Sequence, residues 1–196
     1  LTNKNLSMSE TQAVALIMPV LSSLAQAHAA GLVHRDLKPA NLMLHDVQGS
    51  EPVVKVLGFG CSHGHRSELT AQGAVLGTPG YMSPEQCRGD EVSSTSDVYS
   101  VAVILYRCVT GTLPFDTNQP LQLTSKYAPE AAPDPRSRAD RHVSNSMADV
   151  RMRALAKAPD DRYKSARDMQ RARRTQQKWP PVQAAPAIVA GTSLSV

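Results

Sequence analysis

Eight consecutive residues carry the clearest chemical signal in this sequence: His34-Arg35-Asp36-Leu37-Lys38-Pro39-Ala40-Asn41. They place a carboxylate, an ammonium group and a carboxamide in what we expect to be a turn between two short strands. In phosphoryl transfer, a carboxylate accepts the proton of the attacking hydroxyl, a positive charge stabilises the moving phosphoryl group, and an amide oxygen helps to hold a divalent cation. Asp36, Lys38 and Asn41 carry the functional groups for these three roles.

The same string resembles the catalytic loop of protein kinases, H-R-D-L-x-x-x-N, with the Lys-Pro pair usual in members specific for serine and threonine. The resemblance implies that Asp36 is the catalytic base, that Lys38 faces the transferred phosphate and that Asn41 is a magnesium ligand. It also implies that Met43 lines the nucleotide site and that His34 is structural. By this resemblance the cofactors are ATP and magnesium, and the substrate or partner is a protein.

A second motif, G-T-P-G-Y-M-S-P-E, ends at Glu85 and resembles the peptide-positioning loop and A-P-E element of bacterial Ser/Thr kinases. By this resemblance Thr78 bridges Asp36 and Lys38. Glu85 should form a buried ion pair with Arg162, and this pair would stabilise the fold. Breaking one side of such a pair commonly costs about 3–5 kcal/mol, because the other charge is left buried without its partner.

An apolar segment at residues 96–110, followed by Gly111, predicts a helix and resembles the central helix of the kinase large lobe. Asp97 would then accept hydrogen bonds from the backbone of the catalytic loop. Ala102 stands where the family prefers glycine.

The residues after the predicted third strand depart from the family, which carries Asp-Phe-Gly there. Here the residues are Gly58, Phe59 and Gly60, with Phe59 in a structural role. Magnesium usually relies on one or two carboxylates, and Gly58 leaves Asn41 as the recognisable protein ligand. Losing one preorganised electrostatic contact typically lowers the rate about 100- to 1,000-fold. We therefore expect impaired activity, since Asp46 lies in the neighbouring turn and is not expected to compensate.

Residues 61–76 correspond by resemblance to the activation segment. Thr70 is its candidate phosphorylation site, with Ser67 second, and a phosphate there would pair with Arg35. The alternative, that Thr70 is an unmodified loop hydroxyl, stays open.

The three cysteines, Cys61, Cys87 and Cys108, are scattered and odd in number. This pattern does not indicate a disulfide framework and favours a reducing cytoplasm. Cys61, His63 and His65 would supply three zinc ligands at alternate positions, but a second ligand cluster is missing. A surface loop is the favoured interpretation.

A capping box from Ser7 to Glu10 predicts a helix that runs to about Ala30 and ends at Gly31. His28 is expected to be a packed or half-exposed helix residue, not a ligand. One face of this helix has helical spacing: Val14, Ile17, Met18, Leu21, Leu24, Ala25 and His28. The other expected elements are strands at 32–33, 42–44 and 53–57 and helices at 147–157 and 164–176.

These elements indicate a protein-kinase-like α+β fold of the C-lobe only, mainly α-helical, with short β-strands around the catalytic loop. We expect this lobe at residues 1–176 and a Pro/Ala-rich disordered tail at 177–196. The N-lobe is expected to be absent, because no glycine precedes Gly31 and the glycine-rich phosphate loop is not found. The first residue, Leu1, is not methionine, which suggests a fragment of a longer product.

Composition excludes several classes of function. The formal net charge is +4, and much of the excess lies near the C-terminus, where a solvated helix end is favoured over a nucleic-acid site. Aromatic residues make up 4%, which argues against base stacking. No apolar run approaches the roughly 18 residues of a membrane span.

The sequence leaves three functions open. The first is a Ser/Thr protein kinase by family whose activity is strongly impaired. The second is a pseudokinase-like binding or scaffold module with an apolar surface near Met43 and Phe59. The third is a truncated kinase without function.

Overall fold

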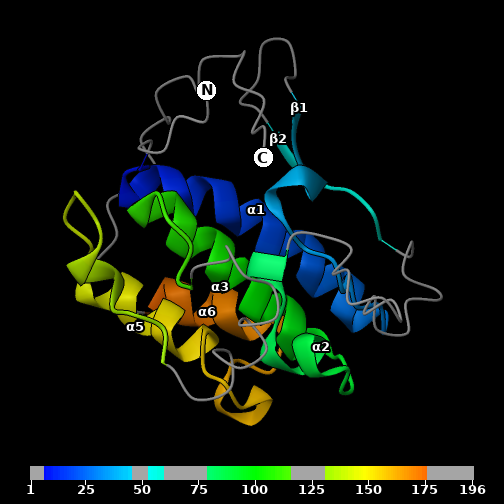
Figure 1. Ribbon diagram of the computed structural model, residues 1–196. Coiled ribbons are helices and arrows are strands. Elements are labelled where there is room, and N and C mark those ends of the chain that lie inside the picture. Colours follow the sequence, from blue (N-terminus) through cyan, green and yellow to red (C-terminus); the bar gives the residue numbers. More distant parts are fainter. Residues whose placement is uncertain (1–6, 46–52, 60–78, 116–130, 176–196) are drawn as a thin grey trace.

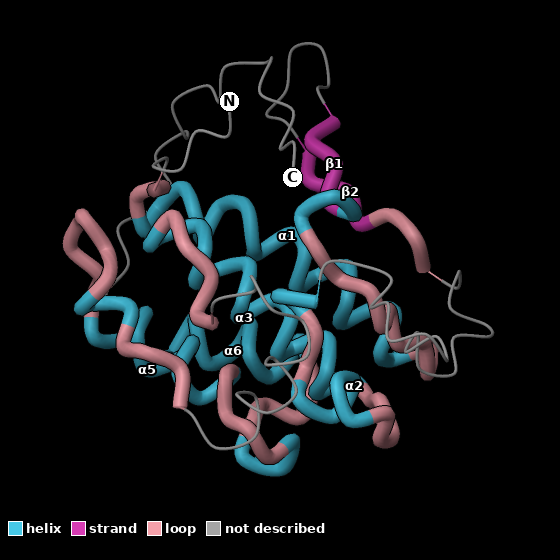
Figure 2. The backbone as a smooth tube through the Cα atoms, viewed as in Figure 1, coloured by secondary structure: helices cyan, strands magenta, loops and turns pink. Residues whose placement is uncertain are grey.

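The computed structural model describes residues 7–45, 53–59, 79–115 and 131–175. Helices form the body of this part, and a two-stranded sheet projects at one end (Figures 1 and 2). This arrangement is consistent with the helix-rich, kinase-like fold that the sequence predicts. The helices and strands are α1 (Glu10–Ala29), β1 (Leu42–His45), β2 (Val53–Val56), α2 (Pro84–Arg88), α3 (Ser94–Thr110), α5 (Asn145–Ala154) and α6 (Ala166–Thr175).

The capping box of α1 lies two residues later than predicted. Ser9 is the N-cap: its hydroxyl accepts from the Gln12 backbone amide at 3.3 Å, and the Gln12 side-chain oxygen Oε1 accepts from the Ser9 backbone amide at 3.0 Å. The predicted partnership of Ser7 and Glu10 is wrong, because the Glu10 carboxylate has another use. It accepts hydrogen bonds from the amide and hydroxyl of Ser144, at 3.0 and 2.8 Å, and so ties the start of α1 to the start of α5.

The end of α1 explains why the predicted strand at Leu32 and Val33 does not form. Gly31 has φ +75°, and its amide donates to the His28 carbonyl at 3.1 Å. The Leu32 amide donates to the Ala27 carbonyl at 2.9 Å, which completes a Schellman motif. Gly31 therefore ends the helix as predicted, and the Leu32 amide caps α1 instead of joining a sheet.

Helix α3 is the centre of the packing, and it contacts α1, α5 and α6 (Figure 1). It begins at Ser94, two residues earlier than predicted, with Ser93 as N-cap, and ends at Gly111 with φ +72°. Its turns are buried on every side, which is the pattern of a core helix. The fully buried residues include Val98, Tyr99, Val101, Ala102, Val103 and Tyr106.

Helix α1 contacts both α3 and α6, so a wider arc of it is buried than a single stripe. Val14 and Met18 of the predicted face are only partly buried. By length and composition alone, the 20 residues of α1 would be able to cross a membrane, contrary to the expectation from the sequence. In this structure the apolar face instead forms part of the core. Its buried residues are Ala13, Leu16, Ile17, Val20, Leu21, Leu24 and Ala25.

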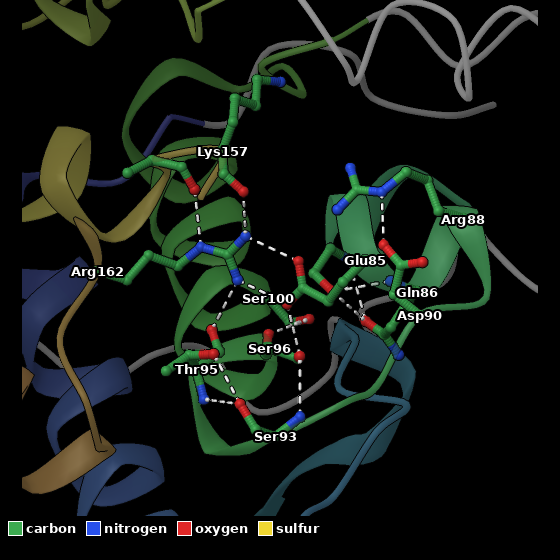
Figure 3. A network of polar contacts seen from close by, with 12 residues as sticks. Glu85, Gln86, Arg88, Asp90, Ser93, Thr95, Ser96, Ser100, Lys157 and Arg162 are labelled. Carbon is green, nitrogen blue, oxygen red and sulfur yellow. Dashed lines mark hydrogen bonds and ion pairs between the residues drawn. The ribbon is translucent and has the colours of Figure 1, made fainter. Parts of the chain in front are cut away.

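A buried ion pair fixes α2 to the rest of the fold, as predicted (Figure 3). The Arg162 Nη1 and Nη2 atoms donate to the two Glu85 carboxylate oxygens at 2.7 and 2.8 Å. Arg162 also donates to the backbone carbonyls of Thr95, Ala156 and Lys157, at 3.1, 2.7 and 2.8 Å. All five guanidinium N–H groups therefore have acceptors, which is what makes a buried arginine tolerable.

The same contacts determine the protonation of Glu85. Burial by itself would raise the pKa of its carboxyl, but the hydrogen bonds from Arg162 and Ser96 outweigh burial and lower the pKa below 4.5. Folding therefore favours the ionised form. The resulting stability is present above the pKa of the unfolded chain and is lost as the pH falls through the lower, folded pKa.

Arg151 on α5 is the opposite case. Its side chain is also fully buried, yet within the described part of the chain its three guanidinium nitrogens have no hydrogen-bond partner. The guanidinium carbon lies 5.6 Å from the centre of the Tyr106 ring. Burial lowers the pKa of Arg151 to about 10. Arg151 thus loses hydration without the compensation that Arg162 receives.

We predict that Glu85→Gln lowers the free energy of unfolding by about 3–5 kcal/mol at pH 7, because it leaves the buried Arg162 charge unpaired. Urea unfolding followed by circular dichroism measures this loss. Asp160→Asn is the matched control, since the Asp160–Lys164 pair is exposed, and we expect little change in the free energy of unfolding. Between neutral pH and pH 3 the wild type should lose more stability than Glu85→Gln; parallel pH profiles would contradict the assignment.

We also predict that Arg151→Met stabilises the protein by about 1–4 kcal/mol, because an apolar side chain of similar length removes the cost of burying an unpaired charge. Thermal and urea unfolding both measure this gain. Arg167→Met on the exposed face of α6 serves as control. A clear loss of stability in Arg151→Met would show that the guanidinium has a partner that stabilises it.

Candidate active site

The candidate loop, residues 34–41, connects α1 to β1, and its last residues form a 3₁₀ turn, Pro39–Asn41. Strands β1 and β2 are antiparallel, with Leu42 opposite Val56. The Leu57 amide donates to the Asn41 carbonyl at 2.8 Å. This pairing brings the end of the loop beside residues 57–59. The strands at 42–44 and 53–57 are therefore confirmed, with small differences at their ends.

Asp97, at the start of α3, holds the loop in place. Its side chain is 1% exposed. Its carboxylate accepts from the backbone amides of His34 and Arg35, at 2.9 and 3.0 Å, so the contact predicted for Asp97 is present. His28 also contacts Asp97, with Nε2 2.8 Å from Oδ2, while the Ala166 amide donates to Nδ1 at 3.4 Å. Nε2 acting as donor to Asp97 and Nδ1 as acceptor from Ala166 satisfies both contacts.

The link through His28 was not foreseen. The prediction of a packed helix residue is confirmed, since its side chain is 5% exposed, but the partner lies 69 positions away in the sequence. The position of His28 on the apolar face of α1 predicts that it is buried, but not which group it contacts. The fold supplies that contact, because α3 and α6 pack against α1.

Asp36, Lys38 and Asn41 lie together, as the sequence predicts. The Lys38 Nζ atom is 2.9 Å from an Asp36 carboxylate oxygen, and the Asp36 side chain is 58% exposed. The Asn41 side-chain amide donates to the Asp36 carbonyl at 2.6 Å and to its carboxylate at 3.2 Å. A carboxylate that is open to solvent and flanked by an ammonium group is placed to receive a hydroxyl group from outside. The roles assigned to these residues stay predictions.

His34 supports this arrangement from inside the molecule. Its ring is buried, and its Nε2 atom lies 2.7 Å from the Leu57 carbonyl oxygen. The ring meets Phe59 edge-to-face with 4.9 Å between centroids. The Asp36 amide approaches His34 Nδ1 at 3.3 Å. These contacts are of the structural kind expected for His34 and Phe59.

Gly58 directly precedes Phe59 and faces the loop. It has φ +88°, a conformation that favours glycine. A Cβ atom added there would lie 3.9 Å from the side-chain amide of Asn41 and 3.9 Å from the His34 ring. There is thus room for a side chain directed at Asn41, although the backbone conformation would be strained with any residue other than glycine.

The described residues do not form the ligand set that magnesium prefers. Asn41 supplies a neutral amide, and Gly58 supplies no side chain. In the described ranges no three His, Cys, Asp or Glu residues come together as metal ligands. Met43, the other residue predicted at the nucleotide site, lies on β1 and is 43% exposed.

Several predicted residues lie outside the described part of the chain. These are the predicted bridge Thr78, the candidate phosphorylation site Thr70 with Ser67, and the neighbouring set Cys61, His63 and His65, together with Asp46. Among the described cysteines, Cys87 and Cys108 are both free thiols. Burial raises the pKa of each to about 11, so both are protonated at neutral pH.

Comparison with known proteins agrees with this geometry. The family model described as protein kinase domain matches residues 1–173. Serine/threonine-protein kinase pkn3 of Myxococcus xanthus is 43% identical over 165 residues, which are 81% of this chain and 30% of that protein. Serine/threonine-protein kinase PknB of Mycobacterium leprae is 37% identical over 164 residues, 83% of this chain and 26% of that protein.

Probable serine/threonine-protein kinase CE0033 of Corynebacterium efficiens is 38% identical over 168 residues, 82% of this chain. The chain thus spans about a quarter to a third of the length of these relatives: 25% of CE0033 and 30% of pkn3. The matched region includes the loop around Asp36 and the Glu85–Arg162 pair. The chain belongs to the protein kinase domain family, and within it to the serine/threonine protein kinases.

Proposed function

We propose that this chain is the large-lobe region of a bacterial Ser/Thr protein kinase whose transfer of phosphate from ATP to protein hydroxyls is strongly impaired. The observation that carries the proposal is Gly58, which faces the Asn41 amide at the position where the family carries an aspartate. The helix-rich fold around the catalytic loop supports the assignment to the large lobe. The nucleotide, the cation and the protein substrate are inferred from the family.

The groups that would handle the substrate hydroxyl are retained. Asp36 is exposed and ionisable, so it can accept the proton of an incoming serine or threonine hydroxyl. Lys38 lies beside it and would neutralise charge on the group being transferred. Asp97 holds the loop backbone under both residues. Thr78 is proposed to bridge Asp36 and Lys38 when a peptide binds.

Cation binding is the weak part of the proposed site. Of its two expected protein ligands, Asn41 supplies only a neutral amide, and Gly58 has no side chain where the family carries a carboxylate. A triphosphate brings several negative charges, and without a well-held cation these charges repel the Asp36 carboxylate nearby. Impaired nucleotide binding, and with it impaired transfer, follows from this electrostatic imbalance.

We predict that the wild-type chain binds ATP in the presence of magnesium more weakly than about 1 mM, or −4 kcal/mol, by calorimetric titration. Gly58→Asp should tighten magnesium-dependent binding by about tenfold or more, because it restores a carboxylate opposite Asn41. Gly58→Ala is the matched control, since it adds the same backbone strain without a ligand. Equal affinities in the two variants would show that position 58 does not ligate the cation.

The same proteins are then assayed with γ-labelled ATP and a Ser/Thr-containing protein substrate. Little or no transfer is expected from the wild type. Robust transfer that disappears in Asp36→Ala would overturn the proposed impairment while leaving the kinase assignment intact. This readout separates the two parts of the proposal.

A second candidate function, a binding module, is favoured by exposed apolar side chains on and beside the two-stranded sheet. Met43, Val53 and Leu57 are 43%, 46% and 42% exposed, and Leu44 is 36% exposed. Both faces of the sheet therefore present apolar surface, which commonly marks an interaction site. The sheet projects from the helical body (Figure 2).

If this surface binds a partner, the wild-type chain should enhance the fluorescence of a hydrophobic dye. The double variant Met43→Ser, Leu57→Ser should lose most of that signal and lose capture of any partner found in pull-downs. Arg167→Ser on α6 controls for a general effect of mutation. A monodisperse monomer that neither binds dye nor captures a partner would contradict the binding role.

A further inference from the structure

Arg35 has an unusual backbone conformation for its residue type. Its φ of +70° is the one positive value among the described residues other than glycine. A residue with a side chain stays in this region only where the surroundings hold it there. Because Arg35 directly precedes Asp36, its conformation sets the direction in which the Asp36 side chain leaves the loop.

Two side chains from different helices hold the two ends of this residue. On the amide side, the Arg35 N–H donates to Asp97 of α3 at 3.0 Å. On the carbonyl side, the Gln86 side-chain amide of α2 donates to the Arg35 oxygen. The left-handed residue is therefore fixed between α3 and α2.

The orientation of the Gln86 carboxamide is itself determined. Its oxygen accepts from the amide and the hydroxyl of Ser83, at 3.0 and 3.1 Å, in the capping box of α2. With the oxygen turned to Ser83, the NH₂ group must face the other way, toward Arg35. The neighbouring residue, Glu85, ties the same helix to Arg162 in the core. The Gln86 side chain, which donates to the loop, therefore belongs to a helix whose own position is fixed by an ion pair (Figure 3).

We propose that Gln86 is a positioning residue: it holds the Arg35 carbonyl, and with it the left-handed turn that directs Asp36 toward Lys38 and Asn41. One carboxamide then couples the capping of α2 to the shape of the candidate catalytic loop. The hydrogen bond from Gln86 holds the loop conformation in the free protein. Its role does not depend on phosphoryl transfer by this chain.

Gln86 has two roles: it accepts from Ser83 in the capping box, and it donates to the Arg35 carbonyl. One substitution separates them. Gln86→Glu keeps an oxygen for Ser83, since glutamate serves equally well in a capping box, but it removes the N–H donor to Arg35. The expected results, by nuclear magnetic resonance, are a shifted Arg35 carbonyl ¹³C resonance and amide exchange at Arg35 faster by about tenfold, the effect of one ordinary hydrogen bond. The Asn41 side-chain resonances should also shift. The Cys87 amide, which donates to Ser83 within α2, should stay protected.

The sequence supplies a matched control. Gln12 occupies the same position in the Ser9 capping box of α1. Gln12→Glu makes the same chemical change and should leave the Arg35 and Asn41 resonances as in the wild type. Changes at Arg35 that are no larger in Gln86→Glu than in Gln12→Glu would overturn the proposal.

A converse variant covers the case in which Gln86→Glu destabilises α2. Gln86→Lys supplies a donor to the Arg35 carbonyl without an acceptor for Ser83. Arg35 protection should return toward the wild-type value, although the Cys87 amide loses protection. If Arg35 exchange instead follows Cys87 exchange in both variants, the loop responds to the stability of α2 and the proposed hydrogen bond has no role of its own.

Discussion

The buried carboxylate of Asp97 is the interaction on which the candidate site depends. A charge at 1% exposure is tolerable only when hydrogen-bond donors surround it. Two of those donors are consecutive amides of the loop, at His34 and Arg35, and a third is the His28 ring. The need to satisfy one carboxylate therefore fixes the loop on α3 and links both to α1.

The second fixed point is α2, which is too short to be stable by itself. Its position depends on the Glu85–Arg162 pair, where all five guanidinium donors are used. Arg151 is equally buried, but among the described residues its guanidinium nitrogens have no hydrogen-bond partner, and burial lowers its pKa to about 10. The two arginines show that the partners, not burial itself, decide whether a buried charge supports the fold.

In the proposed function, Asp36 would be a well-supported base, while the cation would be poorly held. Asp36 and Lys38 sit on a loop that is held by α3, and His34 and Phe59 pack beneath it. At Gly58 the backbone keeps a left-handed conformation and there is space for a side chain, yet no ligand is present. The loop thus keeps Asp36, Lys38 and Asn41 together while Gly58 adds no carboxylate, and the proposed impairment rests on this difference.

The Glu85–Arg162 and Asp97 contacts were predicted from the resemblance to the protein kinase family. The sequence by itself determined the family, the loop at residues 34–41 and both paired strands, because contiguous stretches specify them. It misplaced the α1 cap, since Ser7 and Ser9 both fit a capping box locally and only the docking of α5 gives Glu10 another partner. The tertiary structure alone decided the contacts of His28 and Gln86. Their partners lie 69 and 51 positions away, and local periodicity carries no information about which distant group a buried polar atom will meet.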